Sequence, residues 1–158
     1  MSDVLADTNV LVRWALAHDP LGEVARRAVE RLLRTGATVY VCPQNLTEFW
    51  SVATRPTSAN GFGLTPARTA EEIDRIEGMF PLLEETPEIY SQWRQLVRTA
   101  GVSGRQAFDA RIAAVMMVHH VNGILTFNID DFRRYPDITM VDPHGVPEAA
   151  PAPDQVPE

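Results

Sequence analysis

The stretch VLADTNVLVRW, residues 4–14, begins as a buried strand and continues as a helix, with Asp7, Thr8 and Asn9 at the junction. Its first three residues form a short apolar run typical of a buried strand, and from Val10 onward the apolar residues recur at helical spacing. Asp7 therefore stands at the carboxyl end of the first predicted strand, which is the sheet edge where α/β proteins bind ligands. Asp7 could instead serve only as a helix N-cap, because Asp is a preferred capping residue.

Helical and strand patterns alternate along the rest of the chain. Strands separated by helices need crossover connections, and crossovers produce a parallel sheet that is covered on both faces. The sequence thus predicts a three-layer α/β/α sandwich with a central parallel sheet over residues 1–142, followed by a proline-rich tail, 143–158, that we expect to be disordered. The expected helices are 9–17, 20–35, 43–55, 65–77, one that starts at Pro87, and one that starts at a capping box formed by Ser103 and Gln106 and runs to about 120. The expected strands are 4–6, 38–42, 79–85, 123–127 and 138–142.

The length and composition restrict the class of protein. A chain of 158 residues, 45% hydrophobic and 22% charged, matches one globular domain. No apolar run approaches the roughly 20 residues that a membrane-spanning helix needs. The N-terminus has no signal-peptide pattern, and the lone Cys42 cannot form an internal disulfide, so we expect a cytoplasmic protein.

The formal net charge of −7 argues against nucleic-acid binding by bulk attraction, unless the acidic residues are concentrated in one metal-binding cleft. The 14 basic residues are all arginine, and the sequence contains no lysine. This absence matters for the alternative functions considered below.

Acidic residues occur at three more places that fold formation does not explain. Glu48 points away from the apolar stripe of its helix, toward either solvent or a cleft at the end of the sheet. Asp109 lies on an otherwise apolar helical face that includes Ile112 and Met116, beyond the point where an acid mainly serves the helix dipole. A carboxylate directed at a core needs an arginine or a cation beside it, because an unpaired buried charge is costly.

The fourth acidic site follows the strand near residue 125. Thr126, Asn128, Asp130 and Asp131 leave the sheet at the edge that Asp7 occupies, although turn chemistry could explain any one of them. Carboxylate and amide oxygens suit hard cations, so the pattern indicates Mg²⁺ or Mn²⁺. The histidines lack zinc-site spacing and are given no role.

Four motifs, DTNVLVRW, QNLTEFWSVATRP, AFDARIAA and GILTFNIDDF, together resemble those of PIN-domain ribonucleases, specifically the VapC-type toxins of bacterial toxin–antitoxin pairs. The resemblance covers roughly residues 3–142. Each motif alone is weakly diagnostic, but their order and spacing make the set specific.

The resemblance implies an α/β/α sandwich, Mg²⁺-dependent endonuclease activity on RNA, a small antitoxin as partner, and a homodimer. The acids of the family fall on Asp7, Glu48 and Asp109, and the hydroxyl after the first acid falls on Thr8. The resemblance leaves the fourth ligand open, because the family often has an acid where this chain has Asn128. Two neighbouring acids could replace it, namely Asp130 and Asp131.

Two other functions fit parts of the pattern. An aspartyl-phosphate enzyme or receiver domain also places an aspartate at a strand end. By resemblance, such proteins have a second Asp two residues later or a lysine elsewhere at the site. This chain has Asn9 at the first position and no lysine. A PIN-fold module that binds RNA or protein without cleaving it is the other alternative, with Asn128 as its best support.

Overall fold

The computed structural model describes residues 2–150, and within them four strands form one parallel sheet. The strand order is β2-β1-β3-β4, so the chain first builds outward from β1 on one side and then on the other. The carboxyl ends of β1 and β3 therefore meet at the point where the direction of winding reverses, which is the favoured ligand site of open α/β sheets. The strands are β1 (Val4–Ala6), β2 (Val39–Tyr40), β3 (Gly123–Leu125) and β4 (Thr139–Val141).

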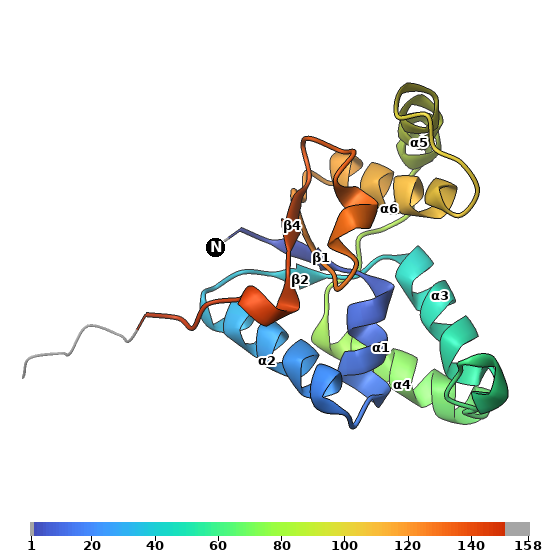
Figure 1. The fold of residues 1–158 in the computed structure, drawn as a ribbon, viewed down its shortest axis with the longest axis vertical. Helices are drawn as coiled ribbons and strands as arrows, with labels where there is room; N and C mark the ends of the chain where they lie inside the picture. The colour runs from blue at the N-terminus through green and yellow to red at the C-terminus, as the bar shows by residue number, and fades with distance from the viewer. Residues whose placement is uncertain (1, 151–158) are drawn as a thin grey trace, which may run out of the picture.

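Helices cover both faces of this sheet, which confirms the expected α/β/α sandwich (Figure 1). Helices α1, α2, α3 and α4 lie on one side, and α5 packs on α6 on the other side. The α-helices are α1 (Thr8–Leu16), α2 (Pro20–Arg34), α3 (Pro43–Thr54), α4 (Pro66–Met79), α5 (Pro87–Thr99) and α6 (Gln106–Val118). Three short 3-10 helices complete the fold, namely η1 (Thr57–Ala59), η2 (Ile129–Phe132) and η3 (Pro143–Gly145).

The alternation of side chains along β1 separates two hydrophobic cores. Val4 and Ala6 point into the core formed with α1 to α4, whereas Leu5 points into the core formed with α5 and α6. All three residues are buried, so β1 is the centre of both cores. Asp7, the next residue, is consequently fixed by packing on both sides of the sheet.

Two sequence expectations differ from the structure. The strand predicted over 79–85 is reduced to a single parallel bridge between Val41 and Leu82, because Pro81 has no N–H to donate to a ladder. The chain from Pro143 is not wholly disordered: Pro143 and Val146 are buried, and η3 packs against α2. Residues 151–158 of the expected tail lie outside the described part of the chain.

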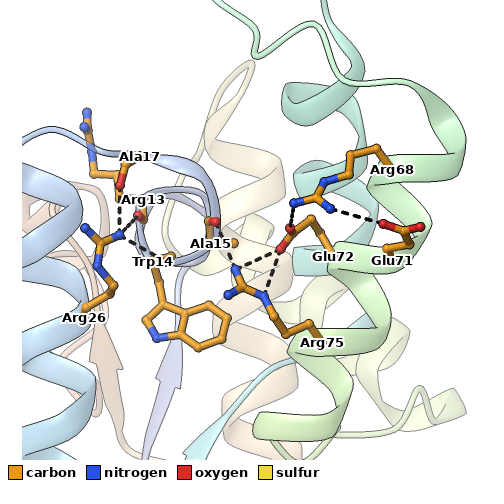
Figure 2. Close-up of polar contacts among 9 residues, drawn as sticks. All are labelled: Arg13, Trp14, Ala15, Ala17, Arg26, Arg68, Glu71, Glu72 and Arg75. Atoms are coloured by element: carbon orange, nitrogen blue, oxygen red, sulfur yellow. Dashed lines mark hydrogen bonds and ion pairs between the residues drawn. The ribbon is translucent and has the colours of Figure 1, made fainter.

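The C-terminal end of α1 is held by two arginines (Figure 2). Nη1 of Arg26 in α2 donates to the carbonyl oxygen of Ala17 at 2.8 Å, and Nη2 of Arg75 in α4 donates to that of Ala15 at 3.0 Å. The Arg75 guanidinium also lies over the Trp14 ring, 4.9 Å from its centroid, and forms an ion pair with the buried Glu72. Because α1 begins beside Asp7, these contacts also fix the orientation of the helix that follows this carboxylate.

Replacing Arg26 with Met should lower the free energy of unfolding by about 2 kcal/mol, because carbonyl groups at the α1 terminus lose a charged hydrogen-bond donor. Urea unfolding followed by circular dichroism measures this change. The matched control is Arg27→Met, which removes only an exposed pair with Glu23 and should cost no more than about 0.5 kcal/mol. Equal losses for the two variants would show that Arg26 does not stabilise α1.

None of the helices in the described part of the chain combines the length and the apolar character needed to cross a membrane.

Candidate active site

Asp7 lies where β1 ends and α1 begins, and both of its carboxylate oxygens accept hydrogen bonds. Oδ1 accepts from the backbone N–H of Thr8 at 2.8 Å, so Asp7 is the N-cap of α1. Oδ2 accepts from the Thr126 hydroxyl at 2.9 Å and from Nδ2 of Asn9 at 3.2 Å. The capping and cleft interpretations of Asp7 are thus compatible, since one oxygen caps the helix and the other faces the loop after β3.

Asn9 and Thr126 join the carboxyl ends of β1 and β3. Nδ2 of Asn9 donates to the Thr126 hydroxyl at 3.2 Å, and Oδ1 of Asn9 accepts from the backbone N–H of Phe127 at 3.1 Å. The Thr126 hydroxyl also accepts from the backbone N–H of Asn128 at 3.0 Å. These bonds hold the loop after β3 against Asp7, so Asn9 and Thr126 position the carboxylate.

Glu48 on α3 points toward this sheet edge. Its Oε2 accepts from the Thr8 hydroxyl at 2.7 Å, and its Oε1 accepts from Nε2 of Gln44 at 2.9 Å. The Glu48 side chain is only partly exposed, in agreement with the cleft interpretation rather than with a solvated face. Thr8 therefore links the element that carries Asp7 with the element that carries Glu48.

Sequence reasoning missed two residues of α3, Gln44 and Asn45. Gln44 donates to Glu48 and also to the Phe108 carbonyl of α6 at 3.0 Å, so it bridges the two helices. The buried Asn45 accepts from the Cys42 backbone N–H at 3.0 Å and lies 3.4 Å from the Thr8 hydroxyl. The i, i+4 spacing of Gln44 and Glu48 was a usable signal, because such pairs share one helix face.

Asp109 on α6 is partly buried, and its carboxylate forms no hydrogen bond or ion pair with any residue between 2 and 150. Arg134 is close enough to lower the pKa of Asp109, but its Nη1 donates instead to Oε1 of Gln106 at 2.9 Å. The buried hydroxyl of Tyr135 also lacks a hydrogen-bond partner in the described residues, and the Asp109 charge raises its pKa in addition to the larger effect of burial. Asp109 is thus a carboxylate without a protein partner.

All three candidates for the fourth ligand are exposed and line one open pocket at η2, and Asp130 also forms an ion pair with Arg133 at 3.0 Å. Asp131 is different, because its charge raises the pKa of both Asp7 and Asp109. Among these candidates, Asp131 is therefore the acid whose charge acts on both Asp7 and Asp109.

Burial is the main cause of the raised pKa values of two acids at this edge of the sheet, Asp7 and Asp109. Desolvation raises the pKa of Asp7 to about 6, while hydrogen bonds from Thr126 and Thr8 lower it and the charges of Glu48 and Asp131 raise it further. Desolvation also raises the pKa of Asp109 to about 6, with additional increases from the neighbouring carboxylates. Crowded acids with raised pKa values are typical of a functional site.

These side chains suit a hard divalent cation by their chemistry. The donors are carboxylate, hydroxyl and amide oxygens, and Asp7, Glu48, Asp109 and Asp131 have no arginine within ion-pair distance among residues 2–150. Within those same residues, no three His, Cys, Asp or Glu side chains are close enough to hold a metal ion directly. This spacing suits Mg²⁺, which keeps several waters and needs only one or two carboxylates as direct ligands.

Comparisons with known proteins agree with this architecture. The PIN domain family model matches residues 4–138. A search of curated protein sequences finds no match.

Among solved structures, VapBC2 from Rickettsia felis, bound to a DNA fragment from its promoter, has a TM-score of 0.67 at 16% identity and covers 90% of this chain and 98% of its own. DNA-bound VapBC from Salmonella typhimurium has a TM-score of 0.66 at 20% identity and covers 90% and 99% of the two chains. VapC20 from Mycobacterium tuberculosis, a toxin that cleaves the sarcin–ricin loop, has a TM-score of 0.54 at 17% identity and covers 77% and 87%. At these identities the similarity establishes a shared fold.

Proposed function

We propose, from the premise that this chain belongs to the PIN domain family, that it is a metal-dependent endoribonuclease and the toxin of a toxin–antitoxin pair. The observation that carries this proposal is the set of four acids, Asp7, Glu48, Asp109 and Asp131, around the sheet edge where β1 and β3 end. Mg²⁺ or Mn²⁺ is the expected cofactor.

Each residue has a distinct role in this proposal. Asp7 and Asp109 would hold the cation directly, and Asp131 and Glu48 would contribute through bound waters. Thr8 fixes the orientation of Glu48 through its hydroxyl, and the same contact keeps α3 against α1. When bound, a divalent cation polarises the scissile phosphate and lowers the pKa of a coordinated water.

The residues of this chain support that chemistry in two ways. The hydrogen bonds on Asp7 hold its carboxylate in one orientation, so the position of the ligand is set before RNA binds. Asp109 lacks an arginine partner within residues 2–150 and so keeps its oxygens available.

Attack of water on phosphorus should leave 5′-phosphate and 3′-hydroxyl ends on the RNA. We expect the purified protein to cleave single-stranded RNA in the presence of Mg²⁺ or Mn²⁺, and we expect EDTA to abolish this cleavage. End-labelled oligonucleotides measure both results. Products that carry a 2′,3′-cyclic phosphate would contradict the mechanism, because that end requires attack by the ribose hydroxyl. Parallel reactions with single-stranded and duplex DNA test the choice of substrate.

A small antitoxin is the partner that this proposal requires. The four carboxylates of the site form no ion pair with an arginine of residues 2–150, so an arginine or lysine of the antitoxin should enter it. Addition of that partner to the same assay should stop RNA cleavage, and undiminished activity of the complex would refute this arrangement. We also propose that the protein forms a homodimer, as the resemblance implies.

Binding without cleavage is the second candidate function. Asn128, an amide where the family often has an acid, favours it. RNA binding that is unchanged by EDTA, without cleavage in Mg²⁺ or Mn²⁺, would establish this alternative in place of the nuclease.

A further inference from the structure

Phe108 is an exposed aromatic residue at the edge of the acidic site. Its exposed fraction is 61%, the same as that of Tyr90 and higher than that of any other large hydrophobic residue in the described chain. Single exposed apolar side chains are common on protein surfaces, so the position of Phe108 beside the acids matters more than its exposure.

The backbone of Phe108 lies between two of the acids. Phe108 directly precedes Asp109 in α6, and its carbonyl oxygen accepts from Nε2 of Gln44 at 3.0 Å. The same nitrogen donates to Oε1 of Glu48 at 2.9 Å. The backbone of Phe108 is therefore held beside the acidic site, and its exposed ring extends from that edge.

Two arginines near the start of α6 form no ion pair with a carboxylate of residues 2–150. Arg105 is exposed, and the guanidinium of the exposed Arg134 donates to the neutral side chain of Gln106 at 2.9 Å while it lies close enough to Asp109 to lower the pKa of that carboxylate. By contrast, three arginines of α2 (Arg27, Arg31 and Arg34) are each paired with a glutamate. Arg94 and Arg98 beside Tyr90 on α5 also form no ion pair within residues 2–150, so Phe108 is distinguished by unpaired arginines that lie next to the acids.

We infer that Phe108 is a stacking platform for a base of single-stranded RNA, and that Arg105 and Arg134 contact the adjoining phosphates. This inference rests on the proposed nuclease function and names the part of the substrate that lies next to the acids. An aromatic ring can stack on any base, and arginine contacts the phosphate backbone without reading sequence. Phe108 would hold the strand so that a neighbouring phosphate lies against Asp109 and Glu48.

RNA affinity is measured separately from cleavage, by fluorescence anisotropy of a labelled ten-nucleotide single-stranded RNA with the full chain in EDTA. Phe108→Ala should weaken binding about 10-fold, the usual effect of losing one stacked base, whereas Phe108→Trp should stay within about 2-fold of wild type. Circular dichroism melting verifies that the variants are folded.

Tyr90→Ala is the matched control, because Tyr90 is equally exposed but lies on α5. It should leave RNA affinity within about 2-fold of wild type. An abasic oligonucleotide has no base to stack and should bind wild type and Phe108→Ala equally. A plot of the logarithm of RNA affinity against the logarithm of salt concentration has a negative slope. Arg105→Gln and Arg134→Gln should each reduce the magnitude of this slope by about one, whereas Phe108→Ala should leave it unchanged.

Unchanged affinity of Phe108→Ala, or a loss that persists with the abasic chain, would overturn the inference; so would a larger effect of Tyr90→Ala. If Phe108 binds a protein instead of RNA, the RNA affinity of Phe108→Ala would be unchanged.

Failure of the proposed function is recognised separately: wild type would then bind RNA with the expected Phe108 dependence but leave it intact in Mg²⁺ and Mn²⁺. If wild type cleaves RNA and Phe108→Ala does so with an unchanged KM, the nuclease function stands and the stacking platform is refuted.

Discussion

Asp109→Asn should lower metal-dependent RNA cleavage by about 1000-fold. A cation ligand contributes several kcal/mol to stabilisation of the transition state, and each 1.36 kcal/mol changes the rate about tenfold. The substitution keeps the shape of the side chain and removes only a charge, so the fold should be preserved. Single-turnover cleavage of a labelled RNA at saturating Mg²⁺ measures the loss.

The melting temperature shows whether the Asp109 carboxylate binds metal or stabilises the fold. In EDTA, Asp109→Asn should melt no lower than wild type, because the carboxylate has no ion-pair partner within residues 2–150 and is repelled by neighbouring acids. Added Mg²⁺ should stabilise the variant less than wild type. A variant that melts lower in EDTA but keeps the full Mg²⁺ shift would mean that Asp109 is a structural residue.

Asp130→Asn is the matched control for this experiment. Asp130 is an exposed aspartate that already has an arginine partner, Arg133, at 3.0 Å. Its replacement should leave both cleavage and the Mg²⁺ shift within about 2-fold of wild type, since exposed ion pairs contribute little. A large loss in this variant would contradict the choice of Asp131 as the fourth acid.

The order of elements could be predicted from the sequence because apolar spacing reports which face of each element is buried. Asp7 was placed correctly at a strand end, since the buried run before it and the helical spacing after it leave no other position. The sequence does not decide whether the Glu48 side chain faces solvent or a cleft at the end of the sheet. A helical pattern shows which side of α3 is apolar, but not which neighbouring element its polar side meets.

Long-range polar contacts could not be predicted. The Thr126 hydroxyl and Asp7 are 119 positions apart, and their contact depends on the register between β1 and β3, which hydrophobic spacing does not determine. The choice between Asp130 and Asp131 depends on the turn of η2, where adjacent side chains point in different directions. The burial of Val146 was missed because a proline-rich composition describes a segment on average and not its one apolar anchor.

The stability of the metal-free protein should fall as pH rises from about 4 to above 6, as far as Asp7 is concerned. The pKa of Asp7 is about 6 in the folded protein, against an ordinary value of 3.8 for an aspartate in water. Between these values the folded state binds more protons than the unfolded state, so the free energy of unfolding decreases with pH. Below the lower value Asp7 is protonated in both states and contributes no penalty. Above the higher value the full penalty is present, at most about 3 kcal/mol.

Urea unfolding in EDTA at several pH values measures this dependence, and Asp7→Asn removes the contribution of Asp7 together with the part of the raised Asp109 pKa that the Asp7 charge causes. Glu85 and Asp142 have lowered pKa values and contribute with the opposite sign, but they do so equally in both proteins. We therefore expect the difference in unfolding free energy between wild type and Asp7→Asn to change by about 2–3 kcal/mol across pH 4–7. A difference that stays constant with pH would show that Asp7 is ionised normally in the fold.

Saturating Mg²⁺ should cancel most of this dependence. The cation binds the ionised carboxylates of the folded protein, so its stabilising effect grows as Asp7 and Asp109 lose their protons. At a free concentration about 100 times the dissociation constant, the gain is about 2.7 kcal/mol, which is enough to offset most of the penalty on Asp7. The raised pKa values and the proposed affinity for metal thus have a common origin, because buried carboxylates that form no ion pair within residues 2–150 bind either protons or a divalent cation. If Mg²⁺ stabilised the protein equally at pH 5 and pH 8, these acids would not be its binding site.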